Sequence, residues 1–491
     1  MTTSQASKIY LFSTVLVAVI GGLLFGYDTA VISGAEKGLQ AFFMNAKDFI
    51  YTDAIHGITC SSALIGCVIG SALSGLFASY LGRKKSLFTA GVLFFLSALG
   101  SYYPEFLFFT KGDASFSLLI AFNCYRILGG IGVGLASAVC PMYIAEIAPS
   151  NLRGTLVSWN QFAIVFGQLV VYFVNFLILG SHINPVIELV DGVNQVINPQ
   201  ESLWSTETGW RLMFVSEAFP AGLFTILVLF IPESPRYLAM CSKDAQALHV
   251  LSRINGSDRA QAILAEIKDT IQEKKERLFT YGILVIFVGI MLSVFQQTVG
   301  INAVLYFAPR IFESMNMGNP MVQTVIMGVV NITFTLVAVF TVEKLGRKPL
   351  LISGSIGMAI GAFGVALSNL CTLPPIIPVV SIMVYSASFM WSWGPICWVL
   401  ISEIFPNTIR GAAVAVAVAF QWIFNFIVSS TFIPLYNIKI GEGGTEFGHI
   451  FVYALYGAIC IIAAVFVWKL VPETKNKTLE EMNQLWGKRS K

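Results

Sequence analysis

The chain has 491 residues, of which 56% are hydrophobic and only 12% are charged, about half the charged fraction of an average soluble protein. The formal net charge of +3 is too small to indicate a nucleic-acid-binding protein. The surplus of apolar side chains must face lipid, which excludes an ordinary soluble fold.

Twelve apolar stretches follow one another along the chain. A membrane-spanning helix needs about 20 mostly apolar residues. The first stretch lacks the short apolar region and cleavage-site pattern of a signal peptide, so it is counted as a membrane helix. The sequence predicts an all-α integral membrane protein with twelve transmembrane helices, over residues 9–33, 56–80, 86–103, 117–145, 154–180, 210–231, 278–311, 320–342, 349–369, 374–404, 411–437 and 447–470.

Lys and Arg residues are unevenly distributed between the two sides of the predicted bundle. Most of the thirty lie in the terminal segments and the even-numbered loops. Cytoplasmic segments of membrane proteins are enriched in Lys and Arg, so we expect a multi-pass protein of the cell (inner) membrane with both termini in the cytoplasm. The odd-numbered loops hold only five: Lys37, Lys47, Lys111, Arg310 and Lys439.

Two connecting segments are longer than the others. Residues 181–209 contain no Lys or Arg and are expected to lie outside the cell, whereas residues 235–277 have the pattern of amphipathic helices on the cytoplasmic side. The second segment separates two sets of six spans. We expect an N-terminal six-helix bundle over residues 1–231, a cytoplasmic amphipathic helical linker over 232–277, a C-terminal six-helix bundle over 278–471 and a cytoplasmic tail over 472–491.

The two halves share three short motifs in the same order. An internal duplication of this kind predicts two related bundles around a central cavity, as in many transporters. The motifs are Gly-Arg-Lys-Lys at 82–85 and Gly-Arg-Lys-Pro at 346–349, Glu-Ile-Ala-Pro-Ser-Asn-Leu-Arg-Gly at 146–154 and Glu-Ile-Phe-Pro-Asn-Thr-Ile-Arg-Gly at 403–411, and Pro-Glu-Ser-Pro-Arg at 232–236 and Pro-Glu-Thr-Lys at 472–475.

Three ionisable residues lie well inside predicted spans: Asp28, Arg126 and Glu217. A charge at the centre of a bilayer costs about 2.5–3.5 kcal/mol on insertion scales, so each needs a structural or functional reason. At about 1.5 Å per residue they lie roughly 8, 14 and 10 Å from the outer ends of their helices, so they can meet if the helices are neighbours. One interpretation is a buried ion pair that only holds helices together.

The odd number of charges favours a proton-binding site instead. There are two acids and one base, and an arginine keeps its proton in proteins. One carboxylate is therefore left to gain and lose a proton as its surroundings change. We predict that Asp28 accepts the proton, that Arg126 adjusts its proton affinity and that Glu217 competes for the arginine.

Side-chain amides and indoles gather in the spans in a pattern suited to a sugar. Amides match hydroxyls that both donate and accept hydrogen bonds, and aromatic rings match the apolar faces of a sugar. For any single amide, a hydrogen bond between helices is the alternative. Gly300 beside Gln297 also predicts a break in span seven. The set comprises Gln161, Gln168, Gln296, Gln297, Asn302, Trp398, Gln421 and Trp422.

Taken together, the motifs resemble those of the sugar porter family of the major facilitator superfamily. The resemblance rests on the repeated motifs, on Phe-Gln-Gln-Thr-Val-Gly-Ile-Asn at 295–302 and on Trp-Gly-Pro-Ile-Cys-Trp at 393–398. Within that family the chain is most similar to bacterial D-xylose/proton symporters, through residues 25–34 and 160–168. The resemblance implies the major facilitator fold, with two six-helix bundles and an intracellular helical loop.

The resemblance also implies a function and a set of sugar contacts. The expected activity is import of a monosaccharide, with D-xylose as the first candidate among the family's substrates, coupled to a proton through the carboxylate that matches Asp28. A sugar uniporter and a hexose/proton symporter are alternatives, and a membrane sugar sensor, which normally adds a long cytoplasmic tail, is a further one. The residues that match sugar-contacting positions are Gln161, Gln296, Gln297, Asn302, Trp398 and Gln421.

An enzyme is not expected, because no arrangement of nucleophile, base and orienting group is apparent and the four histidines are scattered. The eight cysteines form no Cys-x-x-Cys pair, so neither a disulfide framework nor a metal site is predicted. The expected partners are a monosaccharide, a proton and the lipid bilayer, without nucleic acid and without a cofactor other than the co-transported proton.

Charged residues of the repeated motifs are expected to meet at the cytoplasmic surface. Ion pairs between the two halves would close the inner mouth of the cavity in one state and open in the other. The alternative is that they are ordinary interfacial charges, which contribute little singly. The residues are Glu146, Arg153 and Glu233 in the first half and Arg347, Glu403 and Arg410 in the second.

Overall fold

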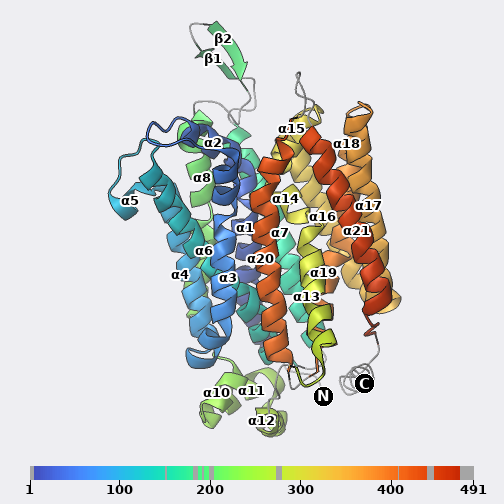
Figure 1. Cartoon of the computed structure of the whole chain (residues 1–491). Coiled ribbons are helices and arrows are strands. Elements are labelled where there is room, and N and C mark those ends of the chain that lie inside the picture. Colours follow the sequence, from blue (N-terminus) through green and yellow to red (C-terminus); the bar gives the residue numbers. More distant parts are fainter. Residues whose placement is uncertain are drawn as a thin grey trace.

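A computed structural model describes most of the chain, and twelve spans in this part are long and apolar enough to cross a membrane. The predicted fold is confirmed: the helices form two bundles side by side (Figure 1). The predicted linker and tail lie partly outside the described residues. The residues that the structure describes are 5–149, 152–180, 186–190, 193–197, 204–271, 279–406, 409–439 and 447–475.

The first bundle contains the helices that precede residue 229. They are α1 (Gln5–Ala30), α2 (Ile32–Met44), α3 (Asp53–Tyr80), α4 (Arg83–Tyr102), the short α5 (Glu105–Phe108), α6 (Phe116–Ile147), α7 (Arg153–Gly180), a π-helical turn η1 (Ser205–Gly209), α8 (Trp210–Val215) and α9 (Ala218–Val228).

The second bundle contains the helices that follow residue 282. They are α13 (Ile283–Thr298), α14 (Ile301–Tyr306), the short α15 (Ala308–Ser314), α16 (Pro320–Leu345), α17 (Arg347–Leu370), α18 (Ile376–Trp391), α19 (Trp393–Ile404), α20 (Arg410–Tyr436) and α21 (Phe447–Leu470).

The two ends of the bundles differ. At the end where α1 begins and α21 ends, here called the terminal face, lie α10 (Pro235–Met240), α11 (Asp244–Asn255) and α12 (Ser257–Ile271) (Figure 1). At the opposite end, the distal face, an antiparallel hairpin pairs β1 (Val186–Val190) with β2 (Val193–Ile197). The linker helices were predicted, whereas this hairpin was not.

Many large apolar side chains are exposed on the outer sides of the two bundles, which explains the high hydrophobic content of the chain. Large side chains such as Phe219 and Phe340 are 81% and 72% exposed, far more than an apolar side chain in a soluble core. These residues lie on membrane-length helices, so their exposed surfaces are suited to lipid.

Several spans are interrupted rather than continuous. Span seven breaks at Gly300, whose φ of +90° lies in the left-handed region that favours glycine, so the predicted break is confirmed. The single span predicted over 278–311 is too long, because the membrane-length part covers Ile283–Tyr306 and α15 is separate. Breaks at Val31 and Ser392, and one next to Glu217, were not predicted.

The repeated motifs build the same turn in both bundles. The carboxylate of Glu233 accepts hydrogen bonds from the backbone N–H groups of Arg83 and Lys84 at the start of α4. In the second bundle, the carboxylate of Glu473 accepts from the N–H groups of Arg347 and Lys348 at the start of α17. A carboxylate at a helix N-terminus is favoured by the helix dipole and by the unpaired N–H groups.

The pKa of Glu473 reflects this arrangement. Partial burial would raise the pKa of this carboxyl, but backbone N–H donors, chiefly those of Lys475, Arg347 and Lys348, lower it below its usual value. A lowered folded-state pKa means that this contribution to stability is present at neutral pH and is lost as the pH falls through the folded-state pKa.

Among the described residues, the charged motif residues at this face form ion pairs within one bundle each. Glu146 pairs with Arg83 of its own bundle, at 2.7 Å, and Glu403 pairs with Arg347 of its own bundle, at 2.9 Å. Arg410 donates to the carbonyl of Phe405, also within its bundle. This arrangement is compatible with the open state that the prediction includes, and ion pairs between the bundles in a closed state stay a prediction.

Helices α3 and α6 approach so closely that side chains are excluded between them. A Cβ atom on Gly130 would lie 1.8 Å from the carbonyl oxygen of Ala63, and one on Gly66 would lie 2.0 Å from that of Ile127. Small residues allow such close approach of helix backbones in membranes.

Replacing Gly130 by Ala should therefore force α3 and α6 apart, at a cost of about 1–3 kcal/mol for overpacking. The expected result is a lower midpoint of thermal unfolding for the purified protein. Gly154→Ala is the matched control, because a Cβ atom there meets no atom within 4 Å. Equal midpoints for the two variants would contradict the close packing.

Candidate functional site

Two of the three intramembrane charges form an ion pair at the centre of the first bundle. Arg126 on α6 donates from Nη1 to Oδ1 of Asp28 on α1 at 2.6 Å, and from Nη2 to the backbone oxygen of Asp28 at 3.1 Å. The guanidinium also lies 4.9 Å from the ring centre of Phe214. Both charged side chains are buried, so the pair is shielded from bulk water.

Glu217 supplies the surplus carboxylate. It is buried next to the break between α8 and α9, and its Oε1 has no hydrogen-bond partner within the described residues. The Oδ2 atom of Asp28 is likewise without one. A buried polar atom without a partner is costly, so these two oxygens are natural places for a proton to bind.

A cavity with a volume of about 80 Å³ lies between the bundles, smaller than the roughly 300–1,000 Å³ of typical small-molecule sites. The amides and the indole predicted to contact a sugar all line it: Gln161, Gln296, Gln297, Asn302, Trp398 and Gln421. Gln168 and Trp422 line it as well, as the sequence suggested, together with Phe25 and Gly394. The structure therefore brings this set together, whereas its contacts with a ligand stay a prediction.

The amides on the second-bundle side are connected to one another. Gln421 on α20 donates to Oε1 of Gln296 on α13, and Asn302 on α14 donates to Oε1 of Gln297 at 2.6 Å. Gln296 in turn donates to the backbone oxygen of Trp393, at the break between α18 and α19, at 3.0 Å. These hydrogen bonds between helices fix the orientation of the amides. They are the contacts expected from the sequence as the alternative to sugar binding for any single amide.

Three polar atoms at the cavity nevertheless have no partner within the described residues: Oε1 of Gln168, Oε1 of Gln421 and Nε1 of Trp422. They comprise two acceptors and one donor, which is the mixture that hydroxyl groups satisfy. The ring of Trp422 lies 5.5 Å from that of Phe25, centre to centre, so aromatic surface is also present. The cavity thus combines unsatisfied polar groups with aromatic faces.

Several lining residues were not predicted. Thr29, Tyr306 and Asn425 line the cavity, and Asn425 and Tyr306 approach one another at 3.5 Å. A spacing signal was available for two of them, because Thr29 lies four residues after Phe25 and Tyr306 lies four residues after Asn302. Residues at this spacing share one face of a helix.

Helix α1 connects the ion pair with the cavity. Phe25 and Thr29 line the cavity, while the adjacent Asp28 contacts Arg126. A shift of α1 that alters the Asp28–Arg126 distance therefore also moves the cavity wall.

Comparisons with known proteins agree with this arrangement. A family model for sugar (and other) transporters matches residues 14–486. The D-xylose-proton symporter of Escherichia coli (strain K12) is 46% identical over 501 residues, covering 99% of this chain and 98% of that protein. The glucose facilitated diffusion protein of Zymomonas mobilis is 35% identical, covering 99% of both chains.

A solved structure shows the same fold. The inward open conformation of the xylose transporter from E. coli matches with a TM-score of 0.82 and 46% sequence identity, covering 97% of this chain and 100% of that one.

The buried pair gives a stability prediction. Arg126→Met leaves the Asp28 carboxylate without its cation and should lower the free energy of unfolding by about 3–5 kcal/mol. The double variant Asp28→Asn/Arg126→Met removes both charges and should recover most of that loss. Thermal unfolding of the purified proteins measures both effects, and a double variant as unstable as the single one would show that the two charges do not depend on each other.

Proposed function

The chain belongs to the family of sugar (and other) transporters, and from this premise we propose that it is a proton-coupled symporter that imports a monosaccharide, D-xylose, by alternating access. The observation that carries the proposal is the buried Asp28–Arg126 pair with the surplus carboxylate of Glu217, on a helix bundle that also lines the cavity. No cofactor is required beyond the co-transported proton.

The sugar is assigned to the cavity between the bundles. The side-chain oxygens of Gln168 and Gln421, which have no partner within the described residues, accept hydrogen bonds from sugar hydroxyls. The N–H of Trp422, also without a partner there, donates to one. Gln161, Gln296, Gln297 and Asn302 supply further amides from both bundles, and Trp398 supplies an apolar face. A ligand held by both bundles favours the conformation in which they enclose it. D-xylose is named because the symporter of 46% identity is a D-xylose-proton symporter.

The proton is assigned to Asp28. When Asp28 is ionised, it holds Arg126 and thereby ties α1 to α6. A proton on Asp28 releases the guanidinium, which can then compensate the buried carboxylate of Glu217. Because Asp28 and the cavity residues Phe25 and Thr29 share α1, proton and sugar favour related states of one equilibrium, and each raises the occupancy of the other.

The terminal face is assigned to the cytoplasm. Most of the described Lys and Arg residues lie in loops and segments at this face, in accord with the positive-inside rule. The distal face is then external, in a cell (inner) membrane, and both termini are cytoplasmic.

Facilitated diffusion is the second candidate, because one of the relatives at 35% identity is a glucose facilitated diffusion protein. It would use the same cavity and would not need Asp28 to change its protonation. Transport against a concentration gradient distinguishes the two.

Asp28→Asn should abolish accumulation of D-xylose driven by an imposed pH gradient in proteoliposomes, because an amide cannot take up and release the proton. Exchange of labelled for unlabelled sugar, which needs no net proton movement, should persist. Accumulation by the variant at the wild-type level would show that Asp28 is not the coupling group.

Trp398→Ala and Gln297→Ala should each weaken D-xylose binding by roughly tenfold, equivalent to about 1.4 kcal/mol, because each removes a lining group from the cavity. Calorimetric titration of the purified, folded variants measures the affinity. Trp468→Ala is the matched control, since that indole is 64% exposed and lies outside the cavity. Wild-type affinity in both cavity variants would remove the assignment of the sugar to this cavity.

A further inference from the structure

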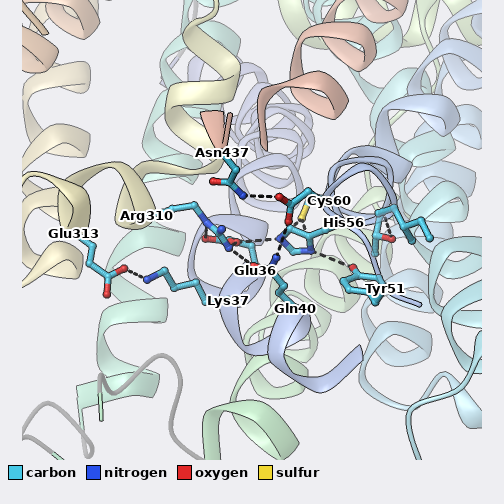
Figure 2. Close-up of polar contacts among 12 residues, drawn as sticks. Glu36, Lys37, Gln40, Tyr51, His56, Cys60, Arg310, Glu313 and Asn437 are labelled. Atoms are coloured by element: carbon cyan, nitrogen blue, oxygen red, sulfur yellow. Dashed lines mark hydrogen bonds and ion pairs between the residues drawn. The ribbon is translucent and has the colours of Figure 1, made fainter. Parts of the chain in front are cut away.

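The distal face carries an ion pair between the two bundles that the coupling mechanism does not use. Glu36 on α2 accepts hydrogen bonds from Arg310 on α15, from Nε to Oε1 at 3.0 Å and from Nη2 to Oε2 at 2.6 Å (Figure 2). This bidentate geometry is the strongest form of an arginine–carboxylate contact. It joins residues that are 274 positions apart in the chain.

First-bundle residues hold the Glu36 carboxylate in place. His56 on α3 lies with Nε2 at 3.1 Å from Oε2 of Glu36. The other ring nitrogen, Nδ1, lies 3.1 Å from the hydroxyl of Tyr51 and 3.8 Å from the sulfur of Cys60. Glu36 and His56 are both fully buried, so the carboxylate is preoriented toward the second bundle.

Two further contacts cross between the bundles beside this pair. Lys37, next to Glu36 on α2, forms an ion pair with Glu313 on α15 (Figure 2). Asn437, at the end of α20, donates to Asp53, at the start of α3, at 2.8 Å. Lys37 and Arg310 are two of only five Lys and Arg residues in the odd-numbered loops, and each pairs with an acid of the opposite bundle.

The backbones of the two bundles also meet below these contacts. A Cβ atom on Gly57 of α3 would lie 2.2 Å from the backbone oxygen of Ser430 on α20. The distal ends of the bundles are therefore closed against each other. At the terminal face, by contrast, Glu146 and Glu403 pair within their own bundles.

We propose that the Glu36–Arg310 pair, supported by His56 and by Lys37–Glu313, is a latch that holds the distal mouth of the cavity shut and must break before solute can enter from that side. This distal latch rests on the proposed alternating access between the bundles, but not on the identity of the sugar or on proton coupling.

The burial of the pair explains why it acts on one state only. With the mouth closed, Glu36 is fully buried, and its charge depends on Arg310 and His56. With the mouth open, water solvates both partners, so neither needs the other. Removing one charge therefore penalises the closed state selectively, because it leaves the remaining charge buried without a partner.

The native thiol of Cys60 reports on this opening. Its sulfur is buried and lies 3.6 Å from Nε2 of His56, directly beside the latch. Modification by a membrane-impermeant thiol reagent, measured peptide by peptide by mass spectrometry in the full chain, should be slow in the wild type. Glu36→Gln and Arg310→Gln should each accelerate it about tenfold or more. The double variant should be no faster than the single ones, because the second substitution has no pair left to break.

The matched control is Glu105→Gln. Glu105 forms a bidentate ion pair with Arg211 within the first bundle, so its loss should leave Cys60 modification within about twofold of the wild type. An unchanged rate in Glu36→Gln, or an equal acceleration in Glu105→Gln, would overturn the latch.

A second measurement separates rocking of the bundles from local loosening. Spin labels at Gly154 and Gly411, where an added side chain meets no atom within 4 Å, report the separation of α7 and α20 at the terminal face, with the three exposed cysteines and Cys60 replaced by Ser. Glu36→Gln should shift this distance toward shorter values as the distal mouth opens. Faster Cys60 modification without that shift would also overturn the proposal.

Neither measurement uses sugar or a proton gradient. A negative result therefore counts against the latch and leaves symport untouched, while an absence of coupled transport in the wild type would contradict the proposed function and leave the latch untouched.

Discussion

The contact between Asp28 and Arg126, 2.6 Å long and buried in the first bundle, is the interaction on which the rest of the structure depends. An arginine in a membrane interior requires a negative partner, and this chain offers two carboxylates for one guanidinium. One oxygen of Asp28 and one of Glu217 lack hydrogen-bond partners within the described residues. When all three groups are ionised, the cluster therefore carries one negative charge that the guanidinium does not balance. Binding of one proton to a carboxylate would balance it.

The two bundles share repeated motifs but differ in the polar groups that they contribute. Their common features lie at the terminal face, where Glu233 and Glu473 bind the starts of α4 and α17 in the same way. The charged cluster occurs in the first bundle, whereas the connected amides belong mainly to the second. Helix α1 joins the two functions, because it contributes Asp28 to one and part of the cavity wall to the other. The distal latch would add a third element, because it joins the two bundles. The ion pairs Glu146–Arg83 and Glu403–Arg347 at the terminal face, by contrast, each lie within one bundle.

Much of this arrangement could be predicted from the sequence, for identifiable reasons. Span length and composition were sufficient for twelve helices, and Gly300 marked a break because its conformation suits glycine. The break at Ser392 was missed although Pro395 follows it, and a proline cannot supply the N–H that would continue the helix. The ion pair between Glu36 and Arg310 could not be predicted from the sequence, because only the packing of the two bundles brings such distant residues together.

The most direct test of the account is the movement of protons when sugar enters. Proteoliposomes containing the wild-type protein, suspended in a weakly buffered medium without a membrane potential, should make the external medium more alkaline on addition of D-xylose, since each entering sugar carries protons inward. Entry of D-xylose with no change in external pH would contradict the central role assigned to the Asp28–Arg126 pair.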